Sequence, residues 1–241
     1  MTKFQFVTTR GMRVIGVTTS LAVVTGIALT PAALASSTPR EQISAAVAAG
    51  NARHYVKIMS INTAPSESQT IAAMAGPGMG IQVLTSSAAG SSEHMTVEYV
   101  NHSLYVKASL GFLRGTFGLS SGTATPLINK WAVVPITNSA YRTVFSGVTI
   151  TSAMSFVASP GRVTAGLPTV KDGVRVKVFH IAIPKSSTSP AGTETLYVAL
   201  SGPPLPVEED VAGGGYTSKI KFSQWGKHFS LSAPATSLQV P

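Results

Sequence analysis

Hydrophobic and polar residues alternate along much of the chain, which is typical of β-strands with one buried face. The clearest example is 95–107, where apolar side chains occupy every second position on both sides of Asn101-His102-Ser103. Period two around a polar turn predicts a β-hairpin. Its alternating apolar residues are Met95, Val97, Tyr99, Leu104 and Val106.

Other segments have strand length and composition, and turn residues separate them. The predicted strands are 54–61, 81–85, 162–165, 174–183, 195–200, 216–222 and 228–231. Lys171-Asp172-Gly173 predicts a turn before the longest of them. The segment 72–80 is rich in Ala, Gly and Met, and we interpret it as a loop or a weak strand.

A helix is predicted just before the first strand. Thr38 and Glu41 have the spacing of a capping box, and Pro39 suits the first helical position. An Ala-rich stretch follows, and Gly50 is a suitable end for the helix.

A helical insert, 110–159, interrupts the strands. Phe112, Leu113 and Phe117 have helical spacing, and 138–146 and 150–158 are each predicted to be helical, with Asn138 and Thr149 as caps. These side chains are typical of a helix face packed on a core, and a lid over a ligand is the alternative.

The order of elements indicates an α+β fold. Strands do not alternate with helices, so a parallel sheet is not expected. We predict a single strongly curved antiparallel sheet, a half-barrel, covered by helices on its concave face, because the apolar face of such a sheet has to be covered.

The N-terminus has the three parts of a secretory signal. Lys3, Arg10 and Arg13 precede an uncharged, mostly apolar run, 14–29, and Ala33-Leu34-Ala35 is a small-x-small cleavage pattern. We expect residues 1–35 to be a signal peptide and 36–241 to be a single domain. An uncleaved membrane anchor is the alternative, although the run is short for a transmembrane helix.

Composition narrows the location and the partners. The chain has no cysteine, so it has neither a disulfide nor the acylated cysteine of a bacterial lipoprotein. We therefore expect a protein released outside the cytoplasm and not lipid-anchored. Residues 36–241 carry 15 basic and nine acidic residues, a net charge of +6 that suits anionic membrane surfaces or polymers. The basic residues are scattered along the chain, which does not favour a nucleic-acid partner. We also expect a monomer.

Three segments in order resemble one family. They are the hairpin ending in Leu104-Tyr105-Val106-Lys107, the segment Lys130-Trp131-Ala132-Val133-Val134-Pro135, and a C-terminal run from Leu196-Tyr197-Val198 to Trp225-Gly226. The order resembles the actinobacterial LppX/LprG-type envelope proteins, whose fold is similar to that of the LolA and LolB lipoprotein carriers. This sequence departs from them at the signal end, where Ser36 replaces the usual lipobox cysteine.

The resemblance implies a half-barrel around an apolar cavity that binds acyl chains of lipids, glycolipids or lipoproteins. Each buried CH₂ contributes roughly 0.8 kcal/mol, which would drive such binding. Candidate lining residues are Met95, Val97, Tyr99, Leu104, Val106, Leu196, Val198, Leu200, Ile220 and Phe222, with Phe112, Leu113 and Phe117 as a lid. Ordinary core packing is the alternative for each. A second hypothesis is an interaction module of the same fold that binds an envelope protein or polymer.

Catalytic motifs are present only as fragments. Gly118-Leu119-Ser120-Ser121-Gly122 matches G-x-S-x-G, and Asp210 and His228 follow in the order of a hydrolase triad. The strand before the Ser and the helix after it are not predicted. A serine hydrolase is therefore the least favoured hypothesis, and we expect no enzyme activity.

Two further patterns are set aside. Ser218 and Lys221 match S-x-x-K, but a strand places them on opposite faces. The histidines have no ligand partner at metal-site spacing, and Glu208-Glu209-Asp210 is interpreted as a solvated turn. We predict no metal and no cofactor.

Overall fold

The computed structural model describes residues 37–241 except 89, 158–160 and 186–189. The expected signal peptide, 1–35, therefore lies outside the described residues. The strands are β1 (Val56–Ala64), β2 (Glu67–Gly76), β3 (Met79–Ala88), β4 (Ser91–Val100), β5 (Ser103–Ala108), β6 (Ala132–Val133), β7 (Arg162–Ala165), β8 (Thr169–Lys171), β9 (Val174–Ile183), β10 (Gly192–Ala199), β11 (Pro206–Gly213), β12 (Tyr216–Ser223) and β13 (Leu238–Gln239). The helices are α1 (Pro39–Ala52), α2 (Leu110–Phe117), α3 (Ser121–Ala124), the 3₁₀ helix η2 (Thr125–Leu127), α4 (Tyr141–Phe145) and α5 (Ile150–Met154).

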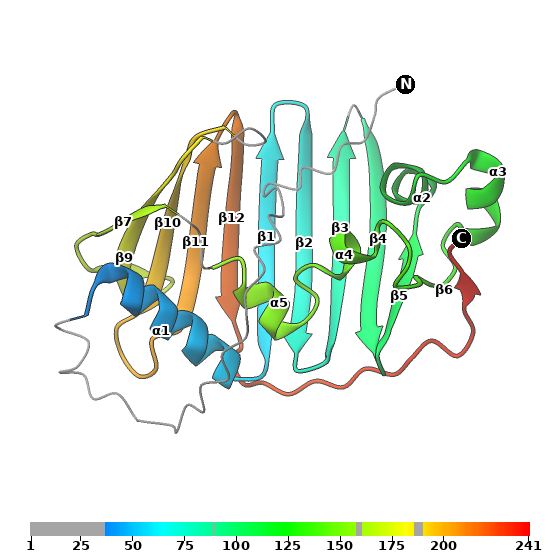
Figure 1. The fold of residues 1–241 in the computed structure, drawn as a ribbon. Coiled ribbons are helices and arrows are strands. Elements are labelled where there is room, and N and C mark those ends of the chain that lie inside the picture. Colours follow the sequence, from blue (N-terminus) through cyan, green and yellow to red (C-terminus); the bar gives the residue numbers. More distant parts are fainter. Residues whose placement is uncertain (1–36, 89, 158–160, 186–189) are drawn as a thin grey trace.

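The strands form one unclosed sheet with helices on one of its faces (Figure 1). Their order is β13-β6-β5-β4-β3-β2-β1-β12-β11-β10-β9-β7, and β8 also pairs with β9. Neighbouring strands are antiparallel except for β13 and β6, which are parallel. This confirms the predicted α+β fold with a single, mostly antiparallel sheet. We call the face that α1, α4 and α5 cover the concave face.

The first helix begins as predicted but ends later. The Thr38 hydroxyl accepts a hydrogen bond from the Glu41 N–H, and the Glu41 carboxylate accepts one from the Thr38 N–H at 2.7 Å, which completes the capping box. Gly50, predicted to end the helix, lies inside it. A Cβ there would be only 2.6 Å from the Met154 sulfur and 3.2 Å from the Trp225 ring, so this glycine allows close packing instead of termination.

Two tight turns follow the sequence prediction. Asn101 and His102 have φ of 50° and 61°, and they join β4 to β5 in a two-residue hairpin in which Ser103 already belongs to the second strand. Asp172 and Gly173, with φ of 48° and 79°, join β8 to β9 in the same way. Positive φ at both central positions matches the right-handed twist of the strands.

Of the two alternatives predicted for the segment 72–80, a loop or a weak strand, the structure shows strand. The segment comprises the end of β2, a two-residue turn and the start of β3. Ala72 pairs with both Met59 and Val83, so its strand is held on two sides. Pairing on both edges outweighs the low strand propensity of Ala and Gly.

The C-terminal prediction of a strand at 228–231 is wrong. His228 and Phe229 pack edge-on against the Tyr55 ring, with centroids 5.0 and 5.6 Å away. The chain then passes the ends of the strands from β12 toward β6 (Figure 1). There, Val240 donates a hydrogen bond to the Val133 carbonyl at 2.9 Å, and β13 pairs with β6.

The segment predicted to be a helical insert contains α2, α3, η2, α4 and α5, together with the short strand β6. Thr149 caps α5 as predicted, because its hydroxyl accepts a hydrogen bond from the Ser152 N–H. Asn138 lies before α4 and accepts a hydrogen bond from the Ala140 N–H at 2.9 Å. α4 and α5 contact β4 and β2 respectively, so this part of the insert covers the concave face.

Candidate functional site

The concave face of the sheet is the candidate site, and strand register defines its residues. Val97 on β4 pairs with Val106 on β5 and with Gln82 on β3, and Gln82 pairs in turn with Ala73 on β2. Paired residues share a face, and alternate residues along each strand return to it. The alternation seen in the sequence therefore identified this face correctly.

An insert-side cluster covers β3 to β6. Its central side chains come from the predicted hairpin and from α2, and Tyr99 packs at its border, with its ring 4.8 Å from that of Phe145. The predicted site residues that lie in this cluster are Met95, Val97, Leu104, Val106, Phe112, Leu113 and Phe117. These hairpin and helix residues are brought together as expected.

A second, α1-side cluster covers β1, β2 and the strands from β12 to β9. It joins side chains of α1 and α5 to Phe179 and Ile181 of β9. The predicted site residues in it are Leu196, Val198 and Phe222, with Ile220 partly buried against them. The candidate residues thus fall into two apolar clusters along one face, instead of lining one enclosed space.

The side chains of these clusters are closely packed. Val97 and Leu196 are 0% exposed, and Leu104 is 1% exposed, so no water-sized space lies beside them. Their role in binding a ligand stays a prediction, and it requires the helices to move away from the sheet.

Leu200 lies in the same alternating row as Leu196 and Val198, but it is 45% exposed. It follows the last residue of β10, beyond buried Val198, and its part in lining a cavity stays a prediction.

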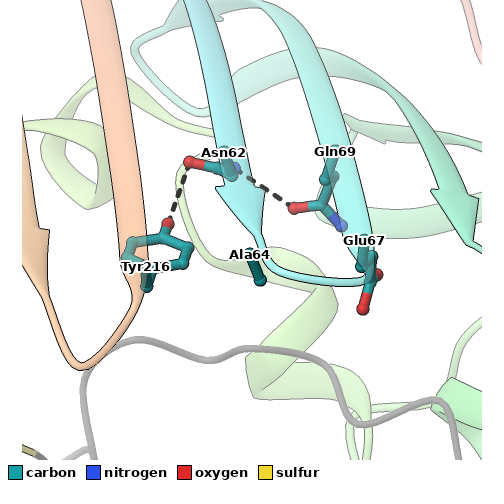
Figure 2. Close-up of a pocket in the computed structure, with 5 residues that line it drawn as sticks. All are labelled: Asn62, Ala64, Glu67, Gln69 and Tyr216. Atoms are coloured by element: carbon teal, nitrogen blue, oxygen red, sulfur yellow. Dashed lines mark hydrogen bonds between the residues drawn. The ribbon is translucent and has the colours of Figure 1, made fainter.

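One end of the concave face is polar. The Asn62 side-chain oxygen accepts hydrogen bonds from Tyr216 at 2.9 Å, Ser218 at 2.7 Å and Ser60 at 3.0 Å. The Asn62 amide donates to Gln69 at 3.3 Å. Figure 2 shows Asn62 between Tyr216 and Gln69 at the edge of a small pocket. The sequence does not reveal this group, because polar residues on a strand are normally assigned to the solvent face.

That pocket has room for about one water molecule. Its volume is about 20 Å³, and Ala64 and Glu67 complete its lining (Figure 2). Sites for drug-sized ligands have roughly 300 Å³ or more, so this pocket alone does not hold a lipid.

The acidic cluster was predicted to be a solvated turn, and this is wrong. Glu208-Glu209-Asp210 lies inside strand β11, and the whole residues Glu208 and Glu209 are 3% and 2% exposed. Glu208 faces away from the helices, and its burial is explained by Lys219 on the adjacent strand β12 and by Lys171 on β8. The Glu208 carboxylate lies 2.6 Å from the Lys171 ammonium and 3.0 Å from that of Lys219.

Lys171 and Lys219 keep the Glu208 carboxylate charged. Burial alone would raise the pKa of Glu208, but hydrogen bonds and charge from Lys171 and Lys219 hold that pKa below its usual value. Hydrogen bonds to Asp210 and Glu208 raise the pKa of Lys219. Glu208, Lys171 and Lys219 are therefore charged at neutral pH, and together with Asp210 they form a network that joins β8, β11 and β12.

Replacing Glu208 by Gln is expected to lower the free energy of unfolding at pH 7 by about 1–2 kcal/mol. A lowered folded-state pKa contributes stability above the unfolded pKa of about 4.3, and this stability is lost as pH falls through the folded pKa. Urea unfolding at a series of pH values below 7 should show a smaller acid loss for Glu208→Gln than for wild type.

Glu98→Gln is the control for this pH series. Burial raises the pKa of the half-buried Glu98, so protonation of this carboxyl in acid favours the folded state. Glu98→Gln should therefore lose more stability in acid than wild type, the opposite of Glu208→Gln. Equal acid loss in wild type and Glu208→Gln would contradict the proposed role of the lysine network.

Comparison with solved structures identifies the fold. LprF from Mycobacterium bovis matches with a TM-score of 0.55 at 15% identity, over 82% of this chain and 97% of LprF. The lipoprotein LppX from Mycobacterium tuberculosis matches with a TM-score of 0.52 at 14% identity, over 80% of this chain and 98% of LppX. The chain has the LprF/LppX fold.

This result confirms the expected resemblance at the level of the fold. No family model matches the sequence, and no curated protein matches it significantly. The LprF/LppX fold therefore identifies the architecture, and the activity has to be argued from the chain's own residues.

The catalytic fragments do not assemble in this fold. The Ser120 hydroxyl caps α3 by accepting a hydrogen bond from the Thr123 N–H, and Asp210 pairs with Lys219. α3 lies near the β6 end of the sheet (Figure 1), whereas β11 is six strands from β5 in the sheet order, roughly 29 Å at about 4.8 Å per strand. Ser120 and Asp210 therefore cannot belong to one triad.

The S-x-x-K residues and the metal-ligand candidates are also separated. Ser218 is buried on β12 and bonded to Asn62, whereas Lys221 pairs with Asp172 on the other face, so the S-x-x-K match fails as predicted. Within residues 37–241, apart from the three gaps, no group of three acidic or histidine side chains is placed to hold a metal ion. In that same part of the chain, no helix has the length and apolarity of a membrane span.

Proposed function

We propose that the protein is an exported, non-catalytic carrier that binds the acyl chains of a lipid or lipidated molecule on its concave face. The observation that supports this is an apolar face extending from β9 to β6, covered mainly by short helices. The fold, shared with LprF and LppX, is consistent with this proposal.

The cover is built so that it can separate from the sheet. α4 and α5 have five residues each, too few for a helix to be stable without packing. Their connecting turn is held by the Gln82 side chain, which donates a hydrogen bond to the Ser146 carbonyl at 3.0 Å. Each CH₂ of an incoming chain would contribute roughly 0.8 kcal/mol, enough over a long chain to replace these contacts.

Locking the cover should therefore prevent lipid uptake. Because the chain has no cysteine, Gln82→Cys with Ser146→Cys gives one defined pair for a cleavable bis-maleimide linker. We expect the linked protein to bind a fluorescent fatty acid at least about tenfold less, with recovery after cleavage, since linking removes the binding-competent state. The two single-cysteine variants treated with the same reagent are the controls.

Native mass spectrometry of protein exported by an actinobacterial host provides the direct measurement. Lipid bound to the wild type is expected. A lipid-free protein that also fails to bind the fatty acid before linking would contradict the proposal. Recovery of an envelope protein or polymer in place of lipid would favour the interaction module.

A further inference from the structure

Exposed apolar side chains gather where β8, β9 and β10 meet at one end of the sheet. Leu167, in the loop between β7 and β8, is 87% exposed, Val170 on β8 is 59% exposed, and Leu200 after β10 is 45% exposed. Side chains of this kind are common singly on protein surfaces, but a group next to an apolar face indicates an interaction site.

Register joins two of these residues in one row. Val170 pairs with Arg175 on β9, and on the other side of Arg175 the Leu200 N–H donates a hydrogen bond to the Arg175 carbonyl at 2.9 Å. The row Val170–Arg175–Leu200 therefore crosses the sheet. We call Val170, Arg175, Lys177 and Leu200 the rim, and Leu167 lies in the loop before β8.

The rim continues the concave face. Leu196, Val198 and Leu200 alternate along one strand direction, so the exposed leucine extends the buried row that belongs to the α1-side cluster. Lys177 pairs with Val198, and so lies on the same face, one row inside Arg175. An apolar chain that crosses the rim would reach Val198 without leaving apolar surface.

The charge at the rim is positive. Arg175 and Lys177 are on the concave side, whereas Lys171 and Lys219 pair with Glu208 and Asp210 on the opposite side. The acidic residues of the concave face nearest in register, Glu194 and Glu209, are 1% and 2% exposed. Glu209 pairs with Leu196, four residues before Leu200 and roughly 13 Å along the strand.

We propose that the rim docks on an anionic lipid bilayer. Apolar tips with adjacent cations are suited to the headgroup region, where the side chains enter the acyl boundary and the cations meet lipid phosphates. This inference goes beyond the proposed carrier function, because docking can occur whether or not a lipid is carried. It also gives the direction in which a chain would enter the concave face.

Vesicle co-sedimentation of the secreted protein tests the rim. The wild type is expected to bind vesicles of phosphatidylglycerol and phosphatidylcholine, and to bind pure phosphatidylcholine more weakly. Leu200→Asp and Val170→Asp should each weaken binding to the anionic vesicles about tenfold, because each places a carboxylate at the bilayer surface. Arg175→Gln should weaken it about fivefold.

Matched controls lie away from the rim. Ile136→Asp makes the same change at an 80% exposed residue of the insert, and Lys107→Gln removes an exposed cation on the opposite face of β5. Both should bind as wild type, and thermal melts should show all variants folded. Equal binding by Leu200→Asp and Ile136→Asp, or wild type that binds no vesicle, would overturn the docking surface. Fatty-acid binding, measured on the same samples without vesicles, reports separately on the carrier function.

Discussion

Replacing Gly80 by Ala is expected to lower the free energy of unfolding by about 3 kcal/mol. Gly80 is a buried residue of β3 on the concave face, where it pairs with Ala75 and Tyr99. A Cβ at this position would overlap the carbonyl oxygen of Val148, in the turn between α4 and α5. Because that atom belongs to the backbone, the turn has to move, and such overpacking costs about 1–3 kcal/mol or more.

Gly122→Ala is the matched control for this substitution. Gly122 lies in α3, and a Cβ there would have nothing within 4 Å. Alanine favours a helix over glycine by up to about 1 kcal/mol, so this variant should be as stable as wild type or more stable. Urea unfolding of both proteins gives the comparison, and a Gly80→Ala variant of wild-type stability would show that the turn yields without cost.

The Gly80 contact also bears on how the apolar face is covered. If the turn between α4 and α5 is displaced, the Gln82 hydrogen bond to Ser146 is lost with it. A folded Gly80→Ala protein would therefore have its cover loosened, and by the carrier proposal it should take up fatty acid faster. The same glycine that permits tight packing would then control access to the apolar face.

The sequence predicts those features of the fold that depend on residues close together along the chain. The alternation in β4 and β5 identified the concave face, since Val97 and Val106 pair on it. The capping box at Thr38 and the turn at Asp172 were also recognisable, because each depends on residues within four positions of one another. These features needed no knowledge of distant contacts.

The failures depend on distant contacts. β11 was missed because Glu208 is paired with lysines from β8 and β12, and no local pattern reveals a neutralised carboxylate. β2 was underestimated because its small residues form a strand only between β1 and β3. β13 is a two-residue strand, too short to leave a pattern.

In the candidate site, too, the sequence predicts what depends on nearby residues and misses what depends on distant contacts. Strand alternation selected side chains of the right face, but it could not show where the covering helices end. Val198 is 4% exposed and Leu200 is 45% exposed, although both belong to one alternating row. The difference between core and rim is set by the packing of α1 and α5, which are brought to the sheet from distant parts of the chain.

Leu196→Ala is expected to lower the free energy of unfolding by about 3 kcal/mol, whereas Leu200→Ala should change it by less than about 0.5 kcal/mol. Leu196 is 0% exposed among Phe179 and its neighbours, so truncation leaves a cavity that the packed cluster cannot fill. Leu200 lies on the exposed rim, where water replaces the lost atoms. Chemical denaturation of the two variants, which differ only in position along one row, makes the measurement.

The pair also distinguishes a packed core from a ligand cavity. If Leu196 lined an open cavity, its truncation would cost little stability and would instead enlarge the space for a fatty acid. A loss below about 1 kcal/mol for Leu196→Ala, with stronger fatty-acid binding, would contradict the packed α1-side cluster. With the expected result, lipid binding beside Leu196 would require α1 and α5 to move away from the sheet, because both pack on this cluster.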